Sequence, residues 1–511
     1  MAQIESLETG GTLAPRAGAR AWFALAVLML PVLLVSVDNT VLSFALPEIA
    51  IALAPSGAEQ LWIIDAYPLV LAGLLVTMGT LGDRFGRRRM LMLGATGFAA
   101  VSVLAAFAPT AGLLIAARAL LGFFGAMLMP STLSLLRSIF LNRDQRRMAI
   151  AVWASAFSAG SALGPIVGGF LLEHFAWGSV FLIAVPVLIP LLVGAPLLVP
   201  ESRDPAPGRI DPISIALSMA TMIPAVYAIK SFAVDGFTIG AVIWALVGIG
   251  MGVLFVRRQL RAKNPMLDMA LFRRGSFSGA ILVNLLSVVA LVGFLYFVPQ
   301  HLQLVLGLSP MVAGLALVPG MAAVIIAGLS VVPISRRVAP NIVVPSALVF
   351  TVIGYLLVAF TAAGHGPLPL IIAFAVLGIG IGAAETISNE LILSSAPAAK
   401  AGAASAVSET AYELGAVLGT AVLGGIITAF YRGALVIPDG VPADAADAAR
   451  ETLAGAYTAS QDLTTHIGSA LWDAAAAAFE SGVTITSVIG AILVVAAGVI
   501  AAITLRTPRS R

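Results

Sequence analysis

Long apolar runs separated by short polar segments repeat along the whole chain. Each run holds about 20 residues, which is enough for an α-helix to cross the roughly 30 Å hydrocarbon core of a bilayer. Because the backbone finds no water inside a membrane, each run is predicted to be an α-helix that satisfies its own N–H and C=O groups. The fourteen predicted spans lie near 21–46, 61–81, 90–108, 112–136, 148–172, 178–199, 212–231, 238–256, 277–300, 311–333, 341–363, 368–395, 404–429 and 483–505.

The composition agrees with a membrane protein. Of the 511 residues, 60% are hydrophobic and only 10% are charged, whereas about a quarter of the residues in a soluble domain are charged. We therefore expect an all-α polytopic membrane protein. The chain has no Cys, which excludes disulfides, thiol catalysis and Cys-based metal sites.

The positions of the basic residues predict the orientation. If the N-terminus is inside, all but four of the 28 Lys and Arg residues lie in the two tails or in loops on that same side. The positive-inside rule expects this bias for an even number of spans with both ends in the cytoplasm. The four exceptions are Arg118, Lys230, Arg432 and Arg450.

One long external loop, 430–482, is predicted between the last two helices. Its acidic residues outnumber its two basic residues, Arg432 and Arg450. The runs "DAADAARETLAGAY" and "SALWDAAAAAF" are typical of short helices, which could form a hairpin on the outer face. A solvated loop without fixed structure is the alternative.

The inventory of polar residues excludes several kinds of active site. A phosphate-binding loop needs the sequence Gly-Lys-Ser/Thr, but none of the three lysines follows a glycine. The four histidines lie in or beside predicted external loops, so neither a Ser-His pair nor a metal site is expected inside the membrane. We expect no enzyme, no ATP, no cofactor, no metal and no nucleic-acid partner. Any work must then draw on an ion gradient.

Four stretches occur in a fixed order along the first half of the chain. They are "DNTVLSFALP" in the first predicted helix, "GTLGDRFGRRR" after the second, "RALLGFFGA" in the fourth and "GSALGPIVGGFL" in the fifth. In this order they resemble the major facilitator superfamily, and specifically its fourteen-helix drug/proton antiporter branch. Further matches are "PSGAEQLWIIDAYPLVLAG", "QHLQLVLGLSPMVAGLALVPG" and "SAVSETAYELGAVLGTAVLGG".

The resemblance implies an architecture and a location. It implies two six-helix bundles related by an axis along the membrane normal, with an additional helix pair between them. A monomer in a bacterial cytoplasmic membrane, with both termini cytoplasmic, is expected. The implied division is a tail 1–20, an N-terminal bundle 21–200, an inserted pair with linkers 201–265, a C-terminal bundle 266–505 including the loop 430–482, and a tail 506–511.

The fifth predicted helix carries a periodic glycine pattern. Gly160, Gly164 and Gly168 recur every four residues, which gives one smooth helix face that a neighbouring helix can approach closely. Pro165 removes a backbone donor and is expected to bend the helix. Plain helix packing is the simpler interpretation. By resemblance, this stretch, which also contains Gly169, marks antiporters.

The basic loop after the second helix is predicted to form a tight turn. Its arginines, including Arg84 and Arg87, could act only as a topology signal and as contacts for lipid headgroups. That interpretation does not explain Asp83 or the glycines Gly79 and Gly86. By resemblance, Asp83 and Arg84 are gating residues that join the two bundles on the cytoplasmic side when the protein faces outward.

Asp38 and Arg118 are charged residues within apolar helices. Asp38 lies past the middle of the outward-running first helix, and Arg118 lies a few residues into the inward-running fourth, so both are expected in the outer half. Burial favours the neutral form of a carboxyl group, whereas a neighbouring cation favours its ionised form. A carboxyl group balanced between these two effects can gain or lose a proton as water access changes. The pair is therefore a candidate proton coupler, and a static structural ion pair is the alternative.

A second group of acids is predicted in the C-terminal half. Glu409 and Glu413 are four residues apart and share a helix face, and Glu385 lies deep in the preceding helix. Glu409 and Glu413 are candidates for proton coupling, and all three are candidates for binding a lipophilic cation. Asp65 is either part of this site or a charge at the membrane interface. The candidate aromatic residues are Tyr67, Trp153, Phe157, Tyr296 and Tyr412, for which simple apolar lining is an equally good interpretation.

The combined hypothesis is a proton-coupled exporter of hydrophobic, mainly cationic compounds that works by alternating access, as a multidrug efflux pump does. One alternative is export or flipping of a lipid or amphiphilic metabolite on the same fold. Another is a membrane scaffold or sensor that transports nothing and acts through the external loop. Deleting 435–480 should abolish the activity of a scaffold and largely spare a pump.

Overall fold

The structure is a computed structural model of the 511-residue chain. It describes all residues except 1–15, 205–210, 263–264, 266, 268, 362–365, 396–400 and 506–511. The predicted cytoplasmic tail 506–511 and most of the tail 1–20 therefore lie outside the described residues.

Fourteen helices of the described chain are long and apolar enough to cross a membrane, which confirms the predicted number. Two of them contain a π-helical segment, labelled η, and one is built from two consecutive helices, α6 and α7. The elements are α1 (Ala19–Leu53), α2 (Gly57–Phe85), α3 (Arg87–Ala106), α4 (Ala111–Ile139), α5 (Arg143–His174), α6 (Ser179–Leu182), α7 (Ala184–Leu198), α8 (Pro212–Asp235), α9 (Ile239–Arg261), α10 (Met269–Phe272), α11 (Gly275–Gln300), η1 (His301–Val305), α12 (Pro310–Ser335), α13 (Pro340–Thr361), α14 (Leu368–Ser395), α15 (Ala401–Leu418), η3 (Gly419–Gly424), α16 (Gly425–Ala434), α17 (Ala443–Glu451), α18 (Leu453–Asp462) and α19 (Thr465–Thr504).

Polar residues at the ends of the apolar runs fix where several helices begin. At the start of α2, the Ser56 hydroxyl accepts a hydrogen bond from the Glu59 amide, and the Glu59 carboxylate accepts one from the Ser56 amide. This capping box satisfies backbone donors that a helix N-terminus leaves free. Thr110 caps α4 and Asn142 caps α5 by the same type of side-chain contact.

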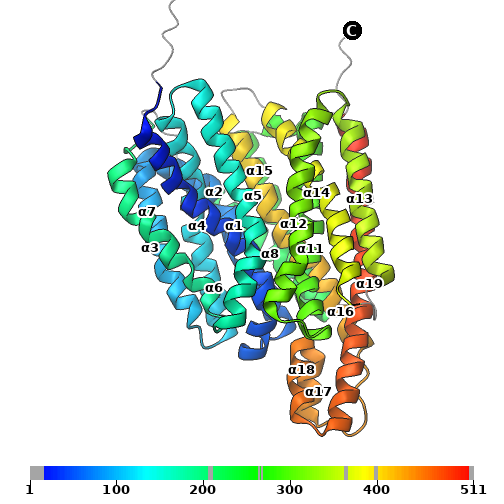
Figure 1. Cartoon of the computed structure of the whole chain (residues 1–511). Helices are drawn as coiled ribbons and strands as arrows, with labels where there is room; N and C mark the ends of the chain where they lie inside the picture. Colours follow the sequence, from blue (N-terminus) through cyan, green and yellow to red (C-terminus); the bar gives the residue numbers. More distant parts are fainter. Residues whose placement is uncertain are drawn as a thin grey trace, which may run out of the picture.

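The buried side chains form two main clusters. One cluster is built mainly from α1 to α7, and the other mainly from α11 to α19. We call these halves the N-terminal and C-terminal bundles (Figure 1). The inserted helices α8 and α9 pack against each other, and α8 also packs against α2 and α16, so that it contacts both bundles.

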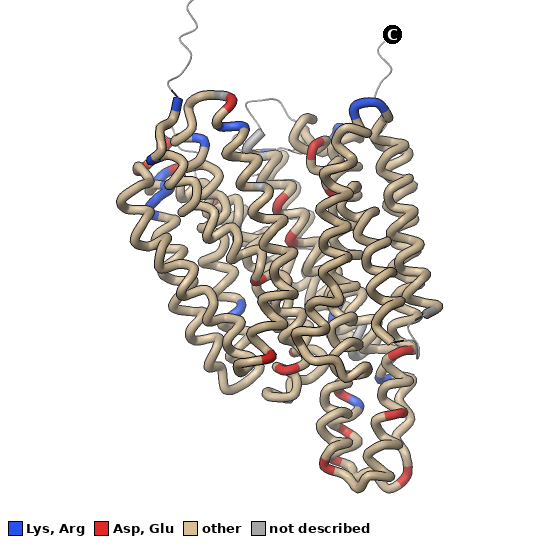
Figure 2. The backbone as a smooth tube through the Cα atoms, in the orientation of Figure 1, with Lys and Arg blue, Asp and Glu red and all other residues tan. Residues whose placement is uncertain are grey.

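The two ends of the molecule differ in shape and in charge. The beginning of α1 and the end of α19 lie at one end, here called the terminal side, while α17 and α18 project from the opposite end, here called the hairpin side (Figure 1). Lys and Arg gather at the terminal side, and Asp and Glu are frequent at the hairpin side (Figure 2).

The predicted loop 430–482 is largely helical, so a loop without fixed structure is the wrong alternative. The run "DAADAARETLAGAY" forms α17 and α18, as expected of short helices. The run "SALWDAAAAAF" does not form a separate helix, because it is the first part of the 40-residue α19, which continues into the last span. An alanine-rich run supplies no helix stop before the apolar segment, so the two join into one helix.

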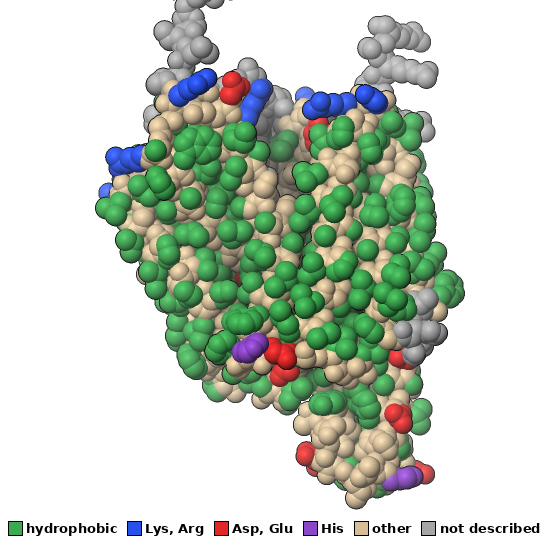
Figure 3. All heavy atoms as spheres, viewed as in Figure 1, with side chains coloured by type: hydrophobic (Ala, Val, Ile, Leu, Met, Phe, Trp, Pro, Cys, Tyr) green, Lys and Arg blue, Asp and Glu red, His purple; other side chains and the backbone are tan. Residues whose placement is uncertain are grey.

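The bundles touch each other at the hairpin side and separate at the terminal side. The Gln303 amide donates to the Phe44 carbonyl at 3.1 Å, and the Met311 amide donates to the Glu173 carboxylate at 3.2 Å. Figure 3 shows a recess between the two halves on the terminal side. The structure is therefore closed at the hairpin side and open toward the terminal side.

Candidate functional site

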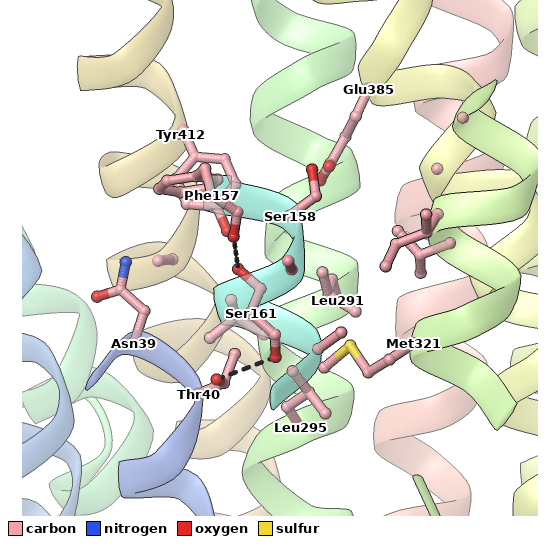
Figure 4. Close-up of a pocket in the computed structure, with 18 of the residues that line it drawn as sticks. Asn39, Thr40, Phe157, Ser158, Ser161, Leu291, Leu295, Met321, Glu385 and Tyr412 are labelled. Atoms are coloured by element: carbon pink, nitrogen blue, oxygen red, sulfur yellow. Dashed lines mark hydrogen bonds between the residues drawn. The ribbon is translucent and has the colours of Figure 1, made fainter. Parts of the chain in front are cut away.

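A cavity of about 500 Å³ lies between the two bundles. Its wall contains residues of α1, α2, α4 and α5 from the N-terminal bundle and of α11, α12, α14 and α15 from the C-terminal bundle. Apolar groups such as Leu291, Leu295 and Met321 form part of the wall, which also contains the carboxyl group of Glu385 (Figure 4). The guanidinium-bearing Arg118 lines the cavity as well. An apolar pocket with a few charged groups is the usual form of a small-molecule site.

Asp38 and Arg118 form a buried ion pair beside this cavity. The Arg118 Nη1 atom lies 2.6 Å from Asp38 Oδ2, and the two residues are 1% and 6% exposed. Arg118 also donates from Nε to the Ile63 carbonyl at 3.2 Å, and its guanidinium lies 4.6 Å from the centre of the Tyr67 ring. The structure thus shows the expected contact between α1 and α4, while its role in proton coupling stays a prediction.

Glu413 connects this pair to the C-terminal bundle. Its side chain is 1% exposed, and it lies within electrostatic range of Glu409, Asp38 and Arg118. Tyr67 interacts with the same four charged groups. The binding hypothesis placed Tyr67 in the substrate site, but Tyr67 is not among the residues that line the cavity. It lies instead near both the Asp38–Arg118 pair and the acids on α15.

Of the predicted site residues, Glu385, Tyr412 and Phe157 line the cavity together with Arg118. The rings of Phe157, on α5, and Tyr412, on α15, meet edge to face with centres 5.8 Å apart, so this contact joins the two bundles. Glu385 points toward Ser158 of the opposite bundle (Figure 4). A carboxyl group and two aromatic rings thus face one apolar space, an arrangement that suits an organic cation when the carboxyl group is ionised.

Two predicted aromatic residues point elsewhere. Trp153 donates from Nε1 to Thr132 Oγ1 at 3.1 Å, which links α5 to α4, and it does not line the cavity. Tyr296 is 3% exposed and packs where Gly424 leaves room for its ring. For both residues the direction of the side chain is set by the rotation of its helix, and a nearly uniform apolar helix gives no sign of that rotation.

Asp65 is buried inside the protein, so it is not an exposed charge at the surface as the interfacial alternative required. It is 0% exposed and forms an ion pair with Lys230 of α8, with 2.8 Å between Lys230 Nζ and Asp65 Oδ2. Lys230 is not among the functional candidates predicted from the sequence. The available signal was its position, since it is a basic residue inside an apolar helix near the side that has few basic residues.

The glycines of α5 allow two close helix contacts. A Cβ on Gly160, Gly164 or Gly168 would overlap with residues of α1, as expected for a smooth helix face. Gly169 faces α12 instead, where an added Cβ would lie 2.8 Å from the Pro310 carbonyl oxygen. On α12, Gly314 packs against the Pro165 carbonyl in the same way. Helix α5 therefore lies between α1 of its own bundle and α12 of the other.

The turn between α2 and α3 is tight, as predicted, because Gly86 has φ +115°, which other residues rarely adopt. The expected latch between the bundles is absent from the described contacts of Asp83, which pairs with Arg87 at 2.8 Å within its own bundle. Arg87 also donates to Ser202 at 3.1 Å. The absence of a latch among the described contacts agrees with a structure that is open at the terminal side, where α2 ends. Two further predicted residues, Gly79 and Arg84, lie on the last two turns of α2, and Arg84 is exposed.

A family model of the Major Facilitator Superfamily matches residues 28–420. The chain belongs to this superfamily. A solved structure shares the fold: a bacterial homologue of the human lysosomal transporter Spinster superposes with a TM-score of 0.68 over 97% of this chain and 100% of that chain, at 16% identity. This likeness shows the fold alone. The chain is a membrane transporter rather than an enzyme.

Named relatives align over most of the chain. The multidrug efflux pump LfrA of Mycolicibacterium smegmatis is 56% identical over 96% of this chain and 97% of its own length. The methyl viologen resistance protein SmvA of Salmonella typhimurium is 36% identical over 90% of this chain and 93% of its own length. The tetracenomycin C resistance and export protein of Streptomyces glaucescens is 33% identical over 79% of this chain and 76% of its own length.

Proposed function

We propose that this protein exports hydrophobic, mainly cationic drugs, dyes or antiseptics in exchange for protons, by alternating access. The observation that carries the proposal is the cavity between the bundles, in which Glu385, Tyr412 and Phe157 face an apolar space next to the buried Asp38–Arg118 pair. The names of the aligned relatives support drug export, because LfrA is called a multidrug efflux pump and SmvA a resistance protein.

The terminal side is proposed to be cytoplasmic. Lys and Arg gather there (Figure 2), and cytoplasmic loops of membrane proteins carry an excess of these residues. With this orientation, the cavity opens to the cytoplasm and the contacts between Gly169 and Pro310 close the outer side. The structure would then be an inward-facing state of a monomer in a bacterial cytoplasmic membrane, ready to accept a substrate.

A lipophilic cation would bind through both its charge and its apolar surface. Glu385 supplies the opposite charge, and the rings of Tyr412 and Phe157 supply apolar and cation–π contacts, which contribute about 0.5–2 kcal/mol for each ring. The aliphatic wall around Met321 adds contact without fixed hydrogen bonds. Such a wall accepts molecules of different shape, as a multidrug exporter must.

Protons and substrate would compete for the same set of buried acids. Glu413 interacts electrostatically with Glu409 and with both members of the Asp38–Arg118 pair, so a proton taken up on one carboxylate changes the electrostatic interaction with the others. Exchange of one proton for one monovalent cation moves no net charge, whereas two protons for each cation would also use the membrane potential, at about 2.3 kcal/mol per charge for 100 mV. The presence of separate acids on α1 and α15 is compatible with two protons.

The test is transport by the wild-type protein in inside-out vesicles with an imposed proton gradient and ethidium as the probe. The proposal expects ethidium to accumulate in the vesicles and the proton gradient to dissipate faster when ethidium is added. An uncoupler, which collapses the gradient, should stop the accumulation of ethidium. A protein that ignores ethidium and moves a fluorescent phospholipid without a proton gradient would instead support the lipid-flipping alternative. Movement of neither probe would overturn the transport proposal.

A further inference from the structure

The inserted helix pair contributes a buried charged residue to its contact with α2. Lys230 of α8 is 2% exposed, and its partner Asp65 of α2 is 0% exposed. Their charged atoms are 2.8 Å apart. Asp65 lies eight residues after the first residue of α2, or about 12 Å along the helix, so the pair is well inside the end of that helix.

The Lys230 ammonium is bound entirely to α2. Its Nζ donates to the Leu61 carbonyl at 3.0 Å and lies 3.9 Å from the centre of the Trp62 ring. A lysine near the end of a membrane helix can extend its long side chain to the interface. Lys230 instead turns inward, where it gives up water for a carbonyl, a ring and a carboxylate.

Asp65 lies at a junction of three parts of the protein. Lys230 faces it from the inserted pair, and Thr420 faces it from the π-helical segment η3 of the C-terminal bundle. Arg118 of α4 and Tyr296 of α11 also interact with it electrostatically. A change in the charge of Asp65 is therefore felt in both bundles and in α8.

Stability alone is a weak reason for this arrangement. The cost of removing two charges from water roughly cancels their attraction, and a buried pair can often be replaced by apolar residues without loss. Ionisable residues inside a membrane usually mark ion pathways. The Asp38–Arg118 pair shows the same pattern, because each cation lies over an aromatic ring of α2 and donates to an α2 carbonyl.

We propose that Lys230 is a positioning residue of the transport cycle. It acts as a built-in counter-ion that keeps Asp65 ionised until Asp65 accepts a proton. This inference rests on the proposed function. When the Asp65 carboxylate accepts a proton, it no longer attracts the ammonium, which stays on the Leu61 carbonyl and the Trp62 ring. When the proton leaves, the ion pair forms again. The inserted helix pair is then a working part of the exchange of protons.

The first test is the pH dependence of ethidium transport in vesicles, for which Lys230→Met, Lys230→Arg and Lys230→Met/Asp65→Asn are compared with wild type. Without the ammonium, Asp65 holds its proton to higher pH, so Lys230→Met should require a pH at least one unit higher for half-maximal transport. Lys230→Arg should keep the wild-type profile, and the double variant should lack this pH-dependent step. Ser218→Ala, a buried polar change on the same helix, is the matched control and should not shift the profile.

A merely structural role gives a different result. In that case the double variant, which has no buried charge left at this place, should transport with the wild-type pH profile, and that outcome would overturn the proposal. An unshifted profile for Lys230→Met would overturn it as well.

The second test does not depend on transport. Dicyclohexylcarbodiimide reacts with protonated carboxyl groups in apolar surroundings, and peptide mass spectrometry can locate the adduct on Asp65. At pH 7.5 we expect at least tenfold more labelling of Asp65 in purified Lys230→Met than in wild type or Lys230→Arg. Equal labelling would overturn the role of Lys230. If wild type moves no ethidium, the proposed function fails, while this labelling still decides whether Lys230 keeps Asp65 ionised.

Discussion

Replacement of Gly164 by alanine tests how tightly α1 and α5 must pack. The added Cβ would overlap with the hydroxyl of Thr40 and lie 2.8 Å from Thr40 Cβ. Carbon atoms normally pack at about 3.5–4.0 Å, so the helices must separate locally by about 1 Å. Thr40 would also lose its hydrogen bond to the Ser161 carbonyl, which is 3.2 Å long.

The opposing terms can be compared. Overpacking costs about 1–3 kcal/mol, and the lost hydrogen bond costs about 0.5–1.5 kcal/mol. Alanine is a better helix former than glycine by about 1 kcal/mol. The net result is a destabilisation of about 0.5–3.5 kcal/mol, opposite in sign to the intrinsic helix preference.

The assay is unfolding of the purified protein in mixed detergent micelles, with Gly498→Ala as the control. Gly498 has no atom within 4 Å of an added Cβ, so its replacement should leave stability unchanged or raise it. Adding Thr40→Ala should restore part of the stability lost in Gly164→Ala, since it removes the hydroxyl but not the Cβ. If Gly164→Ala is as stable as Gly498→Ala, the close approach of α1 and α5 is wrong.

Three further predictions concern the binding site, the buried acids and the start of α8. Glu413→Gln should abolish exchange of ethidium for protons in vesicles, because it removes a buried proton carrier, whereas Glu390→Gln, at an exposed position, should not. Tyr412→Leu should weaken ethidium binding to the purified protein about 2- to 30-fold, equivalent to the loss of one cation–π contact, and unchanged affinity would contradict its place in the site. Hydrogen bonds from Arg258 lower the pKa of Asp211, so Asp211→Asn should lower the melting temperature at neutral pH. That difference should persist as long as the pH stays above the ordinary pKa of an aspartate, and shrink only at lower pH; a difference that grows on acidification would refute this sign.

The sequence was sufficient to predict the helices and one of the two buried ion pairs. Apolar runs of membrane length set the number of spans, and the order of the motifs indicated the superfamily. The contact of Asp38 with Arg118 could be predicted because both are expected at the same depth in helices that the family fold brings together. The glycine spacing on α5 likewise predicted a close helix contact, although not that Gly169 would face the other bundle.

The sequence was not sufficient where the answer depends on helix rotation or on which helices are neighbours. Trp153 and Tyr296 point away from the cavity, and Phe157 and Tyr412 point into it. All four lie in helices that are apolar on most sides, so periodicity gives no preferred face. The partner of Asp65 could not be predicted, because the sequence does not indicate that the inserted helix carrying Lys230 packs against α2.

The most direct test of the account compares wild type with Asp38→Asn in inside-out vesicles that carry a proton gradient, with ethidium as the transported dye. The account predicts that wild type accumulates the dye and dissipates the gradient, while Asp38→Asn, present at the same amount in the membrane, does neither. Dye accumulation by Asp38→Asn at the wild-type rate would contradict it, because Asp38 would then be only a structural partner of Arg118.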